Sequence, residues 1–432
     1  MQSKARGAAL GISFALMILA ASIAGCLFLK EEGDNEMNNE PPISDWTGPY
    51  LDERNATDSG IEDIISANNQ FGMDILQKLY SGEEGNVFIS PYSIFTALSM
   101  TYEGAEGTTE EEMKEVMHLP DNDAERLGSF AKVQNDINKG SDQYELSTAN
   151  TIWPRMDLQM KDRFLNTIRS YYYGNVTELD YAADPEAARE TINTWVEERT
   201  HDRIQDLIPP DVLDALTYMV LTNAIYFKGE WVYEFNEDDT TEKTFQTPDG
   251  QVTVDMMSLK VEEEDTLPYY EDDDLQALEL PYKGDELSMI LVLPRDGDMD
   301  GLISDLDAEK FQNIRSGLQD MEGTVWLPKF KLETKYELVP TMKELGMNAP
   351  FGDADFSGIS DQGAPYISNI IHQTFIEVDE KGTEAAAATA VVMRELSAEG
   401  FYFNANQPFL FMIQQKGTGN ILFTGIIRDP TA

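Results

Sequence analysis

The chain has 432 residues, of which 41% are apolar and 10% aromatic, so it can bury a large core and is not a disordered polypeptide. Its 79 acidic residues outnumber its 31 basic residues and give a formal net charge of −48. Because so negative a surface repels phosphate backbones and anionic lipid headgroups, the charge argues against nucleic-acid binding.

The first 25 residues are predicted to be an export signal. Lys4 and Arg6 precede an apolar run over residues 8–24, and small residues follow before a cysteine. A short positive head, an apolar stretch and small residues before a cleavage site are typical of such a signal. The alternative is a permanent transmembrane anchor, since the run of about 17 apolar residues lies at the lower limit for a membrane-spanning helix.

Cys26 is the only cysteine of the chain, so it has no disulfide partner. The preceding residues Ile-Ala-Gly resemble the lipoprotein box of prokaryotes, in which the cysteine is lipidated and becomes the new N-terminus. Stable anchoring would need at least two acyl chains on this residue. Residues 26–58 are acidic and have no apolar period, which predicts a flexible tether. We therefore expect an exported chain, either lipid-anchored to the outer face of the cytoplasmic membrane or extracellular.

Residues 59–432 show no internal repeat and no second linker, and are predicted to form one domain. Apolar residues at helical spacing predict a helix over 61–80. Pro91 occupies a favoured first-turn position and predicts a buried helix over 91–100. A third helix is predicted over 185–201, with Ile192 and Trp195 on one face.

Strands dominate the rest of the chain and are predicted over residues 218–227, 275–281, 287–293, 325–332, 409–413 and 421–427. The first is almost continuously apolar, as in the middle of a sheet. The second and third flank a Lys-Gly-Asp turn and predict a hairpin. This mixed order of helices, strands and hairpins predicts an α+β fold with large antiparallel sheets.

The residue types that an enzyme would need do not converge in this sequence. The three histidines, His118, His201 and His372, form no zinc-type pair. There is no Gly-x-Ser-x-Gly nucleophile motif, no phosphate-binding glycine loop, and no free cysteine once Cys26 is lipidated. We therefore predict neither catalytic residues nor a cofactor.

One acidic segment matches the calcium loop of the EF-hand. It places carboxylates at alternate positions, then a glycine, then a carboxylate at the twelfth place: Asp296, Asp298, Asp300 and Asp307. Aspartate stands where an EF-hand has a bidentate glutamate, and a strand rather than a helix is predicted before the loop. The alternative is a solvated turn between a strand and a helix.

The segment over residues 378–393 is the most unusual in the chain. Its alanine run favours a helix over 384–396 by propensity. Gly382 and Thr383 provide no strong helix cap, however, and residues 390–392 raise the strand propensity. Propensity alone leaves a surface helix and an extended segment both open.

This segment, Glu380-Lys-Gly-Thr-Glu-Ala-Ala-Ala-Ala-Thr-Ala390, resembles the hinge of the serpin family. The resemblance runs from about residue 61 to 432, with further motifs in the family's order at residues 86–94 (Asn-Val-Phe-Ile-Ser-Pro-Tyr-Ser-Ile), 221–231 (Leu-Thr-Asn-Ala-Ile-Tyr-Phe-Lys-Gly-Glu-Trp), 327–330, 356–358, 406–409 and 423–425. It implies the serpin fold, with three β-sheets, about eight or nine helices and an exposed reactive-centre loop at about 380–403. It also implies a monomer that inhibits proteases.

In serpins a serine protease attacks the loop and forms an acyl-enzyme, and the cut loop then inserts into the main sheet and traps the protease. Since side chains alternate along a strand, every second inserted residue must enter the core. Counted from Thr383, the inward residues would be small or apolar: Thr383, Ala385, Ala387, Thr389, Val391 and Met393. No proline interrupts the segment. This composition favours an inhibitor over a non-inhibitory binding or chaperone member of the family.

The resemblance assigns the hinge to Glu380, Gly382, Thr383, Glu384, Ala385, Ala386, Ala387, Ala388 and Thr389. The family's spacing places the scissile bond fourteen positions after Gly382, between Leu396 and Ser397. A leucine there fits chymotrypsin-like or subtilisin-like serine proteases. A register shift of two would make Arg394 the bait for trypsin-like proteases, and cysteine proteases are a further alternative target.

The resemblance also assigns a polar cluster, the shutter beneath the opening sheet, to Ser90, Ser93, Asn223 and His372. Such a cluster can exchange hydrogen bonds as strands separate. Trp231 corresponds to the aromatic residue beneath the start of the loop, the breach. The alternatives are a core histidine with satisfied hydrogen bonds and a tryptophan that only fills the core.

Overall fold

The computed structural model describes residues 50–262, 265–383 and 400–432. Within them lie the helices α1 (Asp58–Gly82), α2 (Pro91–Tyr102), α3 (Gly107–Val116), α4 (Asp123–Ile137), α5 (Asp162–Tyr171), α6 (Pro185–Arg199), α7 (Met299–Ser304), α8 (Ala308–Gly317) and α9 (Val339–Leu345), and the short 3₁₀ helices η1 (Glu237–Asp239) and η2 (Ala349–Phe351). The predicted export signal, Cys26 and most of the predicted tether fall outside the described residues, as do residues 384–399.

The strands form three sheets. The central sheet has the order β12 (Phe330–Glu337), β13 (Asn369–Val378), β14 (Gly382–Thr383), β4 (Met219–Glu230), β2 (Tyr144–Pro154) and β3 (Asn175–Val176). The seven-stranded sheet has the order β1 (Val87–Ile89), β17 (Ile421–Ile427), β16 (Phe409–Gln415), β9 (Leu287–Pro294), β8 (Leu275–Pro281), β7 (Leu267–Glu271) and β10 (Gln319–Met321). The four-stranded sheet has the order β15 (Phe401–Asn404), β11 (Gly323–Pro328), β6 (Gly250–Val261) and β5 (Thr241–Thr247).

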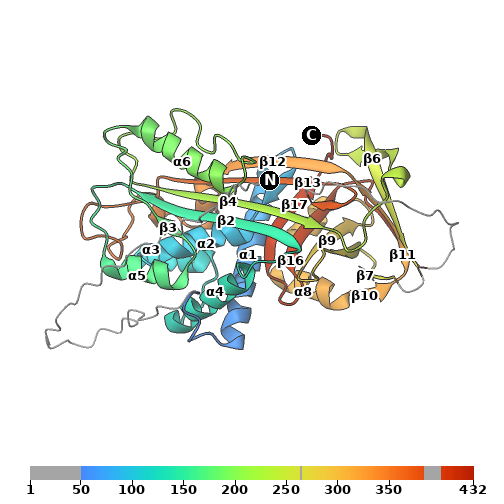
Figure 1. The fold of residues 1–432 in the computed structure, drawn as a ribbon, viewed down its shortest axis with the longest axis horizontal. Helices are drawn as coiled ribbons and strands as arrows, with labels where there is room; N and C mark the ends of the chain where they lie inside the picture. Colours follow the sequence, from blue (N-terminus) through green and yellow to red (C-terminus); the bar gives the residue numbers. More distant parts are fainter. Residues whose placement is uncertain (1–49, 263–264, 384–399) are drawn as a thin grey trace, which may run out of the picture. The chain divides into compact units, whose positions relative to one another are not determined.

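The central sheet is covered on both faces (Figure 1). Along β4, Leu221 and Ile225 belong to the main core, which also contains residues of α2. Val220 and Ala224, which alternate with them, belong to a second core under α6. Because neighbouring side chains of a strand point to opposite faces, the strand must be apolar on both sides. This explains the almost continuous apolar run that the sequence shows here.

The described residues confirm the α+β class, with nine α-helices and three sheets. The helices predicted over 61–80 and 91–100 lie within α1 and α2, and the hairpin is β8–β9. The helix predicted over 185–201 is α6, which ends at Arg199 because His201 has a backbone φ of 51°.

The single strand predicted over residues 325–332 is wrong. It is two strands, β11 and β12, which belong to different sheets. Alternate residues are buried in each strand, but the buried positions are odd-numbered up to Leu327 and even-numbered from Phe330. A continuous strand would have kept the odd positions inward and so placed Lys329 on the buried face. The main-chain N–H of Lys329 donates to Asp255 O instead. The phase change was visible in the sequence and marks the break.

The predicted tether extends too far into the domain. Leu51 is only 4% exposed, and its main-chain N–H donates to Asn135 Oδ1 of α4. The N–H of Asp52 donates to Ser170 O of α5. Residues 51–57 therefore pack on the folded body, because their main-chain groups find partners there. None of the helices in the described part of the chain is both long and apolar enough to span a membrane.

Candidate functional site

The central sheet contains a seam between β4 and β13. Along residues 220–225 and 369–374 the two strands pair with each other in parallel. Beyond that point they diverge, and β14 lies between them, antiparallel to both: Thr383 is in register with Val378 on one side and with Gly229 on the other. Along one part of the seam β4 and β13 therefore pair directly, and along the other part β14 already separates them.

The residue that begins β14 must be a glycine. Gly382 has a φ of 155°, a conformation that side chains disfavour. A Cβ atom at this position would lie 2.1 Å from Gly229 O, so any side chain would push the hinge out of the sheet.

Thr383, the first residue of the predicted inward set, is 1% exposed. Its Oγ1 lies 2.8 Å from the phenol oxygen of Tyr282, and burial raises the pKa of Tyr282, which keeps the phenol neutral. The ring of Tyr282 stacks on Trp231 with 4.5 Å between the centroids. Thr383 is therefore buried against Tyr282, a residue that the sequence did not single out.

Trp231 does more than fill this core. It is 1% exposed, its main-chain N–H donates to Lys381 O at 2.8 Å, and its indole Nε1–H donates to Asp379 O at 3.1 Å. The tryptophan thus fixes the backbone of the two residues on either side of Glu380, just before the chain enters the seam.

Glu380 is the ionic anchor of the hinge. Its buried carboxylate accepts hydrogen bonds from Lys329 Nζ and from Thr240 Oγ1, both at 2.8 Å. Burial alone would raise the pKa of Glu380, but these hydrogen bonds outweigh it and the pKa is lowered. Lys381 pairs with Glu237 at 3.2 Å. Lys329 is a second residue that the sequence reasoning missed, although the phase change between β11 and β12 pointed to its position.

The four predicted shutter residues lie together beneath the paired part of the seam. His372 of β13 accepts the Ser90 main-chain N–H at Nε2 (3.0 Å), so its Nδ1 carries the proton and donates to Asn223 Oδ1 of β4 (2.7 Å). Ser90 caps α2 through the Ser93 main-chain N–H and donates to a carbonyl of β17. All four residues are fully buried.

Asn150 of β2 completes this cluster and was not predicted. Its Oδ1 accepts hydrogen bonds from Asn223 Nδ2 (2.6 Å) and Ser93 Oγ (3.1 Å). A chain of contacts therefore runs from β2 through β4 to β13, and the His372–Asn223 bond is its step across the seam. Burial lowers the pKa of His372 to about 3, so the imidazole is neutral near pH 7.

The remaining predicted site residues fall in segments that the structure does not describe. These are the reactive bond Leu396–Ser397, the alternative bait Arg394, the hinge residues Glu384, Ala385, Ala386, Ala387, Ala388 and Thr389, and the lipidation residue Cys26. Their placement stays a prediction from sequence.

The calcium-loop hypothesis gains no support from the geometry. Asp298 caps α7 by accepting the Gly301 N–H, and Asp307 caps α8 by accepting the Lys310 N–H. Asp296 accepts the main-chain N–H of Asp298, and Asp300 accepts the Tyr80 hydroxyl. Asp296, Asp298 and Asp307 thus serve a local turn and two helix caps, as in the alternative interpretation, while Asp300 bonds to α1. Across the described ranges no three His, Cys, Asp or Glu side chains are placed to hold a metal ion.

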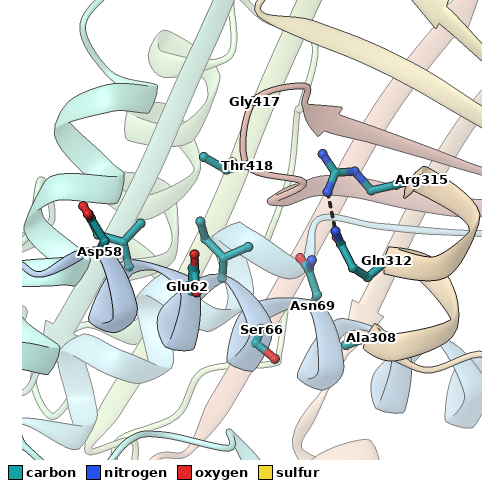
Figure 2. Close-up of a pocket in the computed structure, with 11 residues that line it drawn as sticks. Asp58, Glu62, Ser66, Asn69, Ala308, Gln312, Arg315, Gly417 and Thr418 are labelled. Atoms are coloured by element: carbon teal, nitrogen blue, oxygen red, sulfur yellow. Dashed lines mark hydrogen bonds between the residues drawn. The ribbon is translucent and has the colours of Figure 1, made fainter. Parts of the chain in front are cut away.

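A separate cavity of about 720 Å³ lies between α1, α8 and the β16–β17 turn (Figure 2). Arg315 lines it and donates to Gln312 Oε1 and to Lys416 O, both at 2.8 Å. No ion pair within the described segments involves Arg315, and burial lowers its pKa. Asp58 and Glu62 lie on α1. The cavity thus combines one half-buried guanidinium, whose hydrogen bonds go to neutral acceptors, with an acidic rim.

Comparison with known proteins places these features in one family. The family model described as "Serpin (serine protease inhibitor)" matches residues 66–430. An uncharacterised serpin-like protein of Thermococcus kodakarensis is 38% identical over 422 residues, covering 96% of this chain and 97% of that protein. The crystal structure of Serpin48, a highly specific serpin of the insect Tenebrio molitor, superimposes with a TM-score of 0.74 at 32% identity, covering 85% of this chain and 98% of the other. Human thyroxine-binding globulin in complex with its ligand superimposes with a TM-score of 0.78 at 26% identity, covering 86% and 100%.

Proposed function

The chain belongs to the serpin family, whose members are mostly protease inhibitors rather than catalysts, and we propose that it is a suicide-substrate inhibitor of serine endopeptidases. The protease cleaves the loop between Leu396 and Ser397 and becomes acylated by the leucine carbonyl. The freed hinge then continues β14 into the seam and carries the acylated protease with it.

The open end of the seam carries this proposal. β14 already lies antiparallel between β13 and β4. A longer inserted strand would separate β4 from β13 along residues 220–225 and 369–374, where they now pair in parallel. That single parallel pairing would be replaced by two antiparallel pairings, one between the inserted strand and β4 and one between it and β13. Since antiparallel pairing is at least as stable per residue as parallel pairing, the completed strand gains hydrogen bonds. The seam therefore favours insertion once cleavage frees the loop.

The residues that would follow Thr383 into the sheet suit this process. Small or apolar residues at the inward positions from Ala385 to Met393 can enter the core without burying a charge. Glu384 and Arg394 fall on the other face. The His372–Asn223 hydrogen bond, which spans the seam, must break as the strand enters. The neighbouring polar groups of Asn150 and Ser93 supply replacement partners.

Leucine at the acyl side of the bond favours proteases with an apolar primary pocket, so we propose chymotrypsin-like or subtilisin-like enzymes as targets. The proposal also keeps the location predicted from sequence, an exported chain held through Cys26 at the outer face of the cytoplasmic membrane or extracellular. Residues 1–49 lie outside the described part, so the sequence pattern alone supports the location.

Incubation with chymotrypsin and subtilisin, followed by denaturing gel electrophoresis and mass spectrometry, tests the inhibitor function. We expect a covalent complex that survives denaturation and a released peptide that begins at Ser397. A peptide that begins at Glu395 would move the bait to Arg394. Complete cleavage without any covalent complex would make the chain a substrate and contradict inhibition.

A ligand-carrying protein is the second candidate, and the cavity at Arg315 favours it. A half-buried guanidinium with neutral acceptors only could bind a carboxylate or phosphate group, while Ile61 and Ile65 line the same cavity. Thyroxine-binding globulin shares the fold and binds thyroxine. Cleavage without a complex in the protease experiment would favour this candidate.

A further inference from the structure

The edge of the central sheet at β3 carries a modification motif that has no part in the proposed function. Residues 175–177 (Asn-Val-Thr) form an Asn-x-Thr sequon, the acceptor motif for N-linked glycans in exported proteins. The chain has one other sequon, at residues 55–57 (Asn-Ala-Thr). Because so short a motif also occurs by chance, the position of each sequon in the fold decides whether it can be used.

The two side chains that the motif requires lie on one face of the sheet at β3. Val176 packs against the main core, whereas Leu179 packs against the second core under α6. Since side chains alternate along an extended chain, Asn175 and Thr177 share the parity of Leu179 and face the α6 side. Both are exposed. The amide and the hydroxyl that a glycosyltransferase recognises therefore point into the same solvent.

The backbone of this sequon is the free edge of the sheet. The strand order ends with β2 and β3. The Thr177 N–H donates to Ile152 O (3.0 Å), and the Leu179 N–H donates to Pro154 O (2.9 Å). Since alternate residues of a parallel strand bond to the same neighbour, the N–H and C=O of Val176 point away from β2. No other strand in the described ranges pairs with β3 on that side.

The two groups of the Asn175 sequon have no competing contacts. Within the described part of the chain, neither the side-chain amide of Asn175 nor the hydroxyl of Thr177 has a hydrogen-bond partner. A substituent on the Asn175 amide nitrogen would therefore break no contact of the folded domain and would extend into solvent.

The second sequon differs in this respect. Thr57 is the N-cap of α1, where its Oγ1 accepts the Gly60 main-chain N–H at 3.0 Å and donates to the Glu125 carboxylate. Its hydroxyl is therefore occupied once α1 has formed, although Asn55 is exposed. Of the two sequons, only the one at Asn175 keeps both of its recognised groups available in the folded chain.

We propose that Asn175 is the acceptor of an N-linked glycan, which covers the free edge of the central sheet. The inference rests on the proposed export and not on protease inhibition. The amide nitrogen attacks the anomeric carbon of a saccharide carried on a polyprenyl phosphate or diphosphate. A C–N bond forms as the bond from the anomeric carbon to the phosphate oxygen breaks. The lipid phosphate leaves with that electron pair, and the amide loses one proton.

A glycan at this position would protect the sheet from pairing with a second chain. An edge strand with unpaired N–H and C=O groups is a template for strand addition from another molecule. The saccharide would stand beside the outward main-chain groups of Val176. A chain that lacks the glycan should therefore associate at lower concentration than the glycosylated chain.

Mass spectrometry of the mature chain, purified from the cells that naturally produce it, tests the site. Trypsin releases residues 170–189, which contain Asn175, and residues 55–78, which contain Asn55. We expect a saccharide on the first peptide. Thr177→Val, which removes only the hydroxyl, should abolish it, and Thr177→Ser should keep it. Asn166→Gln, on α5 and outside any sequon, should leave the modification unchanged.

The N-terminal peptide separates a failure of the glycan from a failure of export. An unmodified 170–189 peptide in a chain that begins at Cys26 would overturn the glycan and keep the export. The same peptide unmodified in a chain that still carries residues 1–25 would overturn both. A saccharide on residues 55–78 alone would also overturn the assignment to Asn175.

Sedimentation velocity tests the covering of the edge. Asn175→Gln, which lacks the glycan, should form dimers at a concentration about tenfold lower than the glycosylated parent chain. Asn166→Gln should behave as the parent chain does. Equal association of the parent chain and Asn175→Gln would overturn the covering role.

Discussion

Thr383→Arg is expected to convert the chain from an inhibitor into a substrate. Thr383 is 1% exposed and lies between β13 and β4 against Tyr282, so an arginine there would have to bury its charge beside the neutral phenol of Tyr282. The hinge would stay outside the seam, and the acyl-enzyme would be hydrolysed before insertion. We expect the number of inhibitor molecules cleaved per protease trapped to rise at least about tenfold, as measured by titration of a protease of known concentration.

Thr241→Arg provides the matched control, because Thr241 is exposed on β5 at the edge of the four-stranded sheet. It adds the same charge without touching the seam and should leave the titration unchanged. Urea unfolding of both variants checks that the domain still folds. A Thr383→Arg chain that folds and traps protease as efficiently as its parent would contradict insertion through the seam.

His372→Gln is expected to flatten the dependence of stability on pH. The pKa of His372 is lowered to about 3 in the folded chain, compared with about 6.5 for an exposed histidine. Between these values the unfolded chain binds a proton that the folded chain does not. The contribution of His372 is therefore fully present above pH 6.5 and is lost as the pH falls toward 3, at up to about 1.4 kcal/mol per pH unit.

Urea unfolding between pH 5 and pH 7 measures this effect before most carboxylates titrate. The parent chain should lose stability as the pH falls, and His372→Gln should lose less, although it starts lower by about 2 kcal/mol because the Asn223 and Ser90 hydrogen bonds are broken. His118→Gln is the control, since His118 is exposed and pairs with Asp74. If His118→Gln removed the pH dependence and His372→Gln kept it, the assignment of the neutral buried histidine to the shutter would be wrong.

The sequence predicted the elements whose pattern is local. The strand at β4 followed from its apolar run, and the hairpin β8–β9 from its turn. The single strand predicted over 325–332 was wrong because the prediction used the apolar composition alone. The alternation of apolar and polar residues, which shifts by one position at Lys329, marks the break. The tether was predicted too long because Leu51 is held by a hydrogen bond to Asn135, 84 residues away, and no local pattern reports such a contact.

The residues of the candidate site also divide into those that a sequence pattern predicted and those whose roles depend on contacts between distant parts of the chain. The shutter residues were identified only through the resemblance to a family, since a lone buried histidine has no distinctive local signal. Asn150, Tyr282 and Lys329 were missed because their roles depend on which strands become neighbours. The contacts of residues 200–208 with Glu145 of β2 and Lys335 of β12 could not be predicted, because those strands are far apart in the chain. The hinge pattern, by contrast, was readable because strand insertion imposes a period of two on a continuous segment.

The melting temperature of the chain before and after cleavage of the loop tests the central claim most directly. Insertion would add a central strand paired on both sides, so the cleaved chain should melt more than about 10 °C above the intact chain. In the Thr383→Arg variant, cleavage should give little or no increase. A parent chain that melts at the same or a lower temperature after cleavage between Leu396 and Ser397 would contradict the insertion of the loop.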